Sequence, residues 1–173
     1  LEARADEFLA KAHQTFKDLD AWIRDPSLCG RPVVPAAARD GRETRLADVM
    51  CMASLALDFL KAGATSGGSG GGGGGGGQDA ADEKESYLKL IREAMENCER
   101  HYDIRRGGPP GVLLELCSGD GLRSDSPAGR LFSPEHSIEV AWFLLMMCDA
   151  VGGSPKHEKL AVEVLEGSLA QGW

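Results

Sequence analysis

Two segments of the chain, residues 45–61 and 134–151, are apolar around almost the whole helical circumference, and they restrict the possible folds more than any other feature. A helix in contact with water keeps a polar face, so a helix without one must be enclosed by other elements. Three other segments, about 2–24, 81–103 and the stretch after Pro155, carry apolar residues at three- and four-residue spacing along one side only. The sequence therefore predicts five helices in which one-sided and enclosed helices alternate.

A double layer of antiparallel helices explains this alternation, with one-sided outer helices wrapped around enclosed inner ones. A toroidal α/α barrel has this architecture, whereas a simple four-helix bundle does not need two enclosed helices. We therefore expect an all-α fold in a single domain over residues 1–173, with one short strand at about 112–117. Trp142 is expected to pack in the core, and Leu160, Val164 and Leu165 are expected to face inward from the last helix.

Residues 63–80 are rich in glycine and serine and include eight consecutive glycines at Gly70–Gly77. Such a segment has too little apolar surface to pack, so we expect a flexible insert within the domain. A glycine loop that binds phosphate would need a preceding strand, and no strand is expected before this segment.

Charge and cysteine usage narrow the possible partners and the compartment. The net charge is −8 and no basic patch stands out, so we expect neither a nucleic acid nor an anionic membrane as a partner. No stretch has the pattern of a secretion signal, and the five cysteines form no Cys-x-x-Cys pair, which is typical of reduced thiols in a cytoplasmic protein. The four histidines lie far apart, so we expect no metal site and no cofactor.

One histidine lies in the first turn of an apolar helix. Ser133 is a favourable N-cap residue and Pro134 fits the first helical position, which makes His136 the third residue of that helix. Glu139 follows three residues later and shares its face. The helix dipole disfavours a charged imidazole at this end, and a neutral imidazole can serve as a general base. The alternative is a histidine that only caps the helix or packs in the core.

The residues around this histidine resemble the N-acylglucosamine 2-epimerase family, which is also called renin-binding protein. The resemblance lies in Gly129-Arg130, in the Ser-Pro-x-His-x-x-Glu run at 133–139, and in Ala-Trp-Phe-Leu-Leu at 141–145. It extends more weakly to residues 29–32 and 171–173. The family fold is an (α/α)6 barrel of twelve helices, so the resemblance implies a partial (α/α)6 toroid-like barrel, the middle of a longer protein.

The resemblance implies an isomerase that interconverts N-acetylglucosamine and N-acetylmannosamine. This reaction opens the sugar ring, removes the proton at C2 and returns it on the opposite face, which two acid/base groups achieve most simply. The resemblance assigns one of these roles to His136. Glu139 would orient the imidazole or contact sugar hydroxyls, Arg130 would stabilise negative charge on the opened sugar, and Glu115 would line the cavity. The family has glycine where this chain has Glu135, and its second catalytic histidine lies in helices further toward the C-terminus.

Other interpretations of the same residues remain open. Glu139 is also explained as an acid that favours a helix N-terminus, and Arg130 as a surface residue. The substrate could be another sugar, since related epimerases and aldose-ketose isomerases share the barrel. Alternatively, the chain is a non-catalytic helical interaction module, or a truncated remnant of such an enzyme. Incompletely covered apolar helices tend to associate, so a homo-oligomer through exposed apolar faces is also expected.

Overall fold

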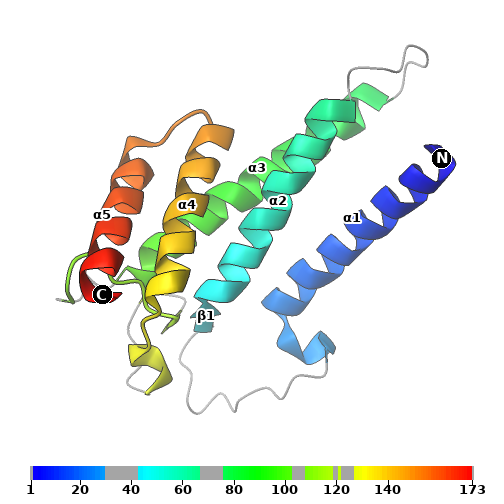
Figure 1. The fold of residues 1–173 in the computed structure, drawn as a ribbon. Coiled ribbons are helices and arrows are strands. Elements are labelled where there is room, and N and C mark those ends of the chain that lie inside the picture. The colour runs from blue at the N-terminus through cyan, green and yellow to red at the C-terminus, as the bar shows by residue number, and fades with distance from the viewer. Residues whose placement is uncertain are drawn as a thin grey trace. The chain divides into compact units, whose positions relative to one another are not determined.

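The computed structural model describes most of the chain, namely residues 2–29, 43–66, 76–102, 108–118, 121 and 127–172. Within these residues the protein has five α-helices, two 3-10 turns and a sheet of two short strands (Figure 1). The helices are α1 (Glu2–Arg24), α2 (Leu46–Ser66), α3 (Gly76–His101), α4 (Pro134–Ala150) and α5 (Pro155–Gly172). The predicted all-α fold with about five helices is confirmed. None of the described helices combines the length and the apolar character that crossing a membrane requires.

The chain forms two compact units, Leu1–Asp40 and Gly41–Trp173. The first unit contains α1 and the 3-10 turn η1 (Pro26–Cys29). Helix α1 ends where the sequence predicts, because a residue that precedes proline is disfavoured in the helical conformation. Ion pairs between side chains one turn apart stabilise the helix on its exposed face. In one of them, Lys11 Nζ lies 2.6 Å from Glu7 Oε1.

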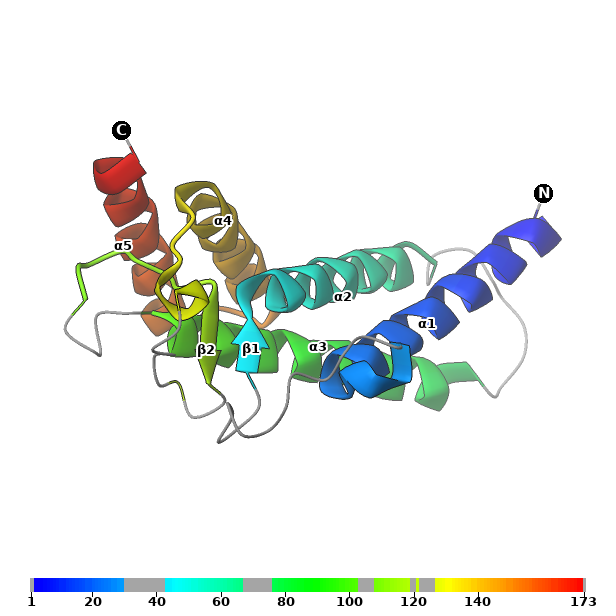
Figure 2. The same cartoon turned by 90° about the horizontal axis from the view of Figure 1, so that it is seen from below.

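The second unit consists of two antiparallel helix pairs, α2 with α3 and α4 with α5, which lie side by side in both views (Figures 1 and 2). Helix α2 is largely enclosed, as its sequence predicts. Its buried apolar side chains are Leu46, Val49, Met50, Met52, Ala53, Ala56 and Leu57. The amphipathic helix α3 supplies one buried stripe, which includes Ile91, Met95 and Cys98. The rings of Phe59 and Tyr87 stack with their centroids 5.4 Å apart and join the two helices.

Both ends of the segment predicted as a flexible insert are helical. Helix α2 continues to Ser66 and α3 begins at Gly76, so the described parts of residues 63–80 belong to helices. Lengthening an existing helix is easier than starting one, because each added residue gains one hydrogen bond. Ala62 and Ala64 have a high helix propensity and favour this lengthening. Residues 67–75 lie outside the described part of the chain.

Helix α4 is less enclosed than its sequence predicts. Ile138, Trp142 and Leu145, which we call the α4 stripe, are 36%, 59% and 46% exposed. The prediction that Trp142 packs in the core is therefore wrong. The physical reason is that α2, α3 and α5 contact the other sides of α4, where Val140 and Leu144 are fully buried.

Helix α5 also leaves an apolar surface uncovered. Leu160 is buried as expected, but Val162, Leu165 and Leu169 are exposed, and we call these three residues the α5 stripe. The prediction that Leu165 faces inward is wrong. Val164, one residue earlier, is fully buried as predicted. A rotation of about 100° per residue separates the two side chains, so both cannot point into the same core.

A strand-like segment at residues 113–118 pairs with the backbone near the ends of three helices. Strand β2 (Leu116–Ser118) pairs with β1 (Glu43–Arg45) in antiparallel register, and isolated bridges join the preceding Leu113 and Leu114 to Tyr102 and Phe132. The strand predicted at 112–117 is thus partly present, as short pairings rather than one continuous strand. Through these pairings the segment contacts the start of α2, the end of α3 and the residues that lead into α4.

Candidate functional site

The structure places a carboxylate against the histidine singled out from the sequence. His136 Nδ1 lies 2.9 Å from Glu115 Oε1, although 21 positions separate the two residues in the chain. The Glu115 side chain is 12% exposed and the His136 side chain is 42% exposed. The pair therefore has a shielded acid and an imidazole that solutes can reach.

Backbone hydrogen bonds hold Glu115 in position from both sides. Its N–H donates to the carbonyl of Leu131 at 2.9 Å, and its carbonyl accepts from the N–H of Leu46 at 3.0 Å. These bonds fix the carboxylate between the start of α2 and the segment before α4. The first turn of α4 then carries His136 to it, because Pro134 begins the helix and Ser133 adopts the extended backbone of an N-cap residue.

The contact determines what the imidazole can do. A neutral His136 that donates its Nδ1 hydrogen to Glu115 keeps a free lone pair on Nε2. Nε2 can then accept a proton from a bound molecule, and the resulting imidazolium is stabilised by the adjacent carboxylate. This acid–imidazole pair is a general-base arrangement.

Two other residues expected at the site, Glu139 and Arg130, are exposed near the start of α4. Glu139 is exposed one turn further along α4, and no described residue forms a hydrogen bond or ion pair with its carboxylate. Arg130 is exposed at the end of the 3-10 turn η4 (Ala128–Arg130), shortly before α4. The orienting contact that local spacing suggests for Glu139 is made by Glu115 instead.

Glu135, at the position where the resembled family has glycine, is also exposed. Its own backbone N–H at the start of α4 lowers the pKa of the carboxyl group. The side chain is therefore an anion beside the candidate base at neutral pH.

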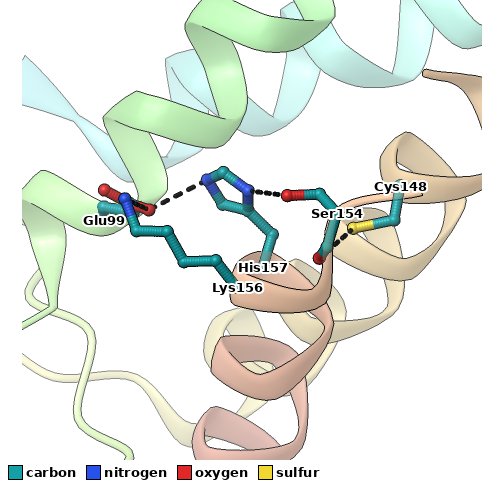
Figure 3. A network of polar contacts seen from close by, with 5 residues as sticks. All are labelled: Glu99, Cys148, Ser154, Lys156 and His157. Atoms are coloured by element: carbon teal, nitrogen blue, oxygen red, sulfur yellow. Dashed lines mark hydrogen bonds and ion pairs between the residues drawn. The ribbon is translucent and has the colours of Figure 1, made fainter. Parts of the chain in front are cut away.

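The sequence repeats the start of α4 at the start of α5, a repeat that the predictions from sequence did not include. Ser154-Pro155-Lys156-His157 has the same Ser-Pro-x-His pattern as residues 133–136, so the repeated tetrapeptide was the available signal. Figure 3 shows the contacts of this second motif. Ser154 Oγ lies 2.7 Å from His157 Nδ1, and His157 Nε2 lies 3.0 Å from Glu99 Oε1 on α3. Lys156 Nζ approaches the same Glu99 oxygen at 2.5 Å.

The second Ser-Pro-x-His motif, residues 154–157, connects α5 to α3 through Glu99. Burial lowers the pKa of His157, against a smaller raising effect of Glu99, so the ring is neutral at pH 7. The Ser154 hydroxyl then donates to Nδ1 while the Nε2 hydrogen faces the carboxylate. The Nε2 contact is electrostatic, because its geometry does not satisfy a directed hydrogen bond despite the short distance. His157, a half-buried ring with a polar contact on each side, therefore has a structural role between α5 and α3.

The two Ser-Pro-x-His motifs cannot act on one substrate. They open antiparallel helices, so they lie at opposite ends of the α4–α5 pair (Figures 1 and 2). From His136 to the end of α4 the helix rises by about 20 Å. His101 is also unsuited to act on a substrate, because it is fully buried and its Nδ1 lies 2.6 Å from the carbonyl oxygen of Leu114.

No protein-family model matches the sequence, and no curated protein sequence matches it. Within the described residues, no group of three or more histidine, cysteine, aspartate or glutamate side chains is arranged to hold a metal ion. Among the described residues, the Glu115–His136 pair and the motif that contains His136 are the features that point to a function.

Proposed function

We propose that this protein is an N-acylglucosamine 2-epimerase-like isomerase in which His136 exchanges the proton at C2 of an N-acylated amino sugar. The observation that carries the proposal is the 2.9 Å contact between Glu115 and His136, which leaves Nε2 available as a base. The residues 129–145 that resemble the epimerase family support the choice of substrate, N-acetylglucosamine or N-acetylmannosamine. Free thiols at Cys51, Cys98 and Cys148 suit the cytoplasm as the compartment.

The proposed reaction begins when the sugar opens to its aldehyde form, which makes the C2 hydrogen acidic. His136 Nε2 takes this proton, the electron pair moves toward the carbonyl oxygen, and Glu115 stabilises the imidazolium that forms. Arg130 is assigned to the negative charge that develops on the sugar oxygen. The imidazolium, which solvent can reach, exchanges this hydrogen with water. It then returns a hydrogen to C2 as the electron pair moves back from the oxygen, and the sugar ring closes again.

A single base favours exchange over inversion. His136 returns the proton to the face from which it was taken, and His157 and His101 are both unsuited to serve the opposite face. We therefore expect the described residues alone to support exchange of the C2 hydrogen that is faster than epimerisation.

The test is incorporation of deuterium at C2 of N-acetylmannosamine in heavy water, followed by NMR. His136→Ala should lower the exchange rate by about 10²- to 10⁴-fold, the usual contribution of a general base. His157→Gln is the matched control, because it removes a histidine from the other Ser-Pro-x-His motif and should leave exchange unchanged in a folded sample. Equal rates in wild type and His136→Ala would refute the proposal.

Glu115 is tested as a positioning residue. Glu115→Gln should lower the exchange rate, and Glu115→Asp should restore part of it. Nitrogen-15 NMR of the His136 ring adds a readout of its own, because loss of the carboxylate should reduce the population that carries the hydrogen on Nδ1. An unchanged tautomer and an unchanged rate in Glu115→Gln would show that the carboxylate does not orient the base.

One observation favours a second candidate, a helical interaction module that forms a homo-oligomer. The α4 stripe and the α5 stripe each expose three large apolar side chains, and such surfaces commonly mark contact sites between proteins. Sedimentation at increasing protein concentration tests self-association, and Trp142→Glu in the centre of the α4 stripe should shift the protein toward monomer.

A further inference from the structure

A concave surface lies where α2, α3 and α4 meet, near the C-terminal end of α4 and away from His136. This groove has a volume of about 290 Å³. Its lining residues are Leu57, Leu60, Lys61, Lys84, Leu88, Met146, Asp149 and Ala150. This volume is close to the lower limit of about 300 Å³ for small-molecule sites in proteins, so only a small ligand would fit.

The lining of the groove is divided between apolar and charged side chains. Five of the eight residues are apolar and come from all three helices, so a ligand here would contact methyl and methylene groups on three sides. The remaining three are exposed charged residues, Lys61, Lys84 and Asp149. Such a lining is complementary to a ligand with an apolar body and a charged end.

Lys61 and Lys84 indicate that the charged end of the ligand is negative. Neither Lys61 nor Lys84 forms an ion pair with a carboxylate among the described residues. By contrast, Lys11 and Lys159 each pair with a glutamate one turn away on their own helices. In a chain with a net charge of −8, two lysines without such partners beside an apolar surface form a local site that attracts an anion.

Asp149, which also lines the groove, indicates how the ligand is oriented. Its carboxylate repels an anionic group, so the head group is expected near Lys61 and Lys84. The apolar body then extends toward Met146 and Ala150 of α4.

We propose that this groove binds a small amphiphile with one anionic head group, of the chemical class represented by medium-chain carboxylates. The lysine ammonium groups contact the head group as point charges, and the leucines and Met146 bury the chain. Each additional buried methylene is expected to raise the affinity about fourfold. This proposal is independent of the sugar chemistry proposed for His136.

The test is a titration of the full chain with decanoate below its micellar concentration, followed by two-dimensional NMR of the backbone amides. Shifts should be largest at the residues of the groove. Octanoate should bind about sixteenfold more weakly because it lacks two methylenes, each worth about fourfold. Uncharged 1-decanol should also bind more weakly than decanoate, since it lacks the charge that faces the lysines.

The double variant Lys61→Glu/Lys84→Glu should lose decanoate binding by tenfold or more. Lys17→Glu/Lys89→Glu is the matched control, because it makes the same change in net charge at exposed lysines outside the groove. Ala150→Phe, which adds a side chain within the groove, should weaken decanoate and decanol together. Equal binding by the two double variants, equal affinity for decanol, or shifts that arise only with micelles would each overturn the proposal.

Discussion

Helix α5 approaches the loop before β2 so closely that two glycines are in contact. A Cβ atom at Gly167 would lie 2.4 Å from the Cα of Gly111 and 2.4 Å from the carbonyl oxygen of Pro110. Both neighbouring atoms belong to the backbone, so they cannot rotate away as a flexible side chain could. Gly167→Ala therefore forces α5 and this loop apart.

The size of the effect follows from two opposing terms. Alanine in a helix interior is favoured over glycine by about 1 kcal/mol. Overpacking in a close contact typically costs about 1–3 kcal/mol, and more when the backbone has to move. The loop also carries two hydrogen bonds at this junction. The Gly111 N–H donates to Tyr102 Oη at 3.3 Å, and the Tyr102 hydroxyl donates to Glu163 Oε2 at 2.9 Å. Weakening them adds about 1 kcal/mol.

We therefore expect Gly167→Ala to lower the free energy of unfolding by about 1–3 kcal/mol. Gly63→Ala is the matched control, because a Cβ at this position of α2 would meet no atom within 4 Å. It should raise stability by as much as about 1 kcal/mol. Urea unfolding followed by circular dichroism measures both variants. A Gly167→Ala protein as stable as wild type, or equal shifts in the two variants, would refute the close approach.

Three further predictions concern the second unit. Because burial lowers the pKa of His157 from 6.5, the unfolded chain binds that proton more readily, and stability should fall as the pH drops below 6.5 toward the lower folded value. His157→Gln should flatten this part of the pH profile of urea unfolding; a profile identical to wild type would contradict the assignment. Burial raises the pKa of Cys98 to about 12, so a thiol reagent should modify the exposed Cys51 in the native protein and Cys98 only after unfolding, which mass spectrometry of labelled peptides can check. Leu144→Ala should lower stability by about 2–5 kcal/mol in urea unfolding, because the side chain is fully buried, whereas Leu145→Ala on the exposed stripe should change it far less.

The sequence predicted most of the helices and several of their ends. Helix α1 covers residues 2–24 as its apolar spacing and Pro26 indicate, and α4 begins at Pro134 after Ser133. These features depend on backbone preferences of neighbouring residues, which a local pattern contains. The general-base candidate His136 was found in the same way, from its place in the first turn of a helix.

Contacts between distant parts of the chain decided the rest. Local spacing pointed to Glu139 as the partner of His136, but backbone pairing of the strand-like segment brings Glu115 to the imidazole instead. Which apolar side chains of α4 and α5 are buried also depends on the helices around them, so Trp142 and Leu165 are exposed although their own helices gave no sign of it. A helical period specifies which residues share a face, whereas the neighbours that cover that face come from elsewhere in the fold.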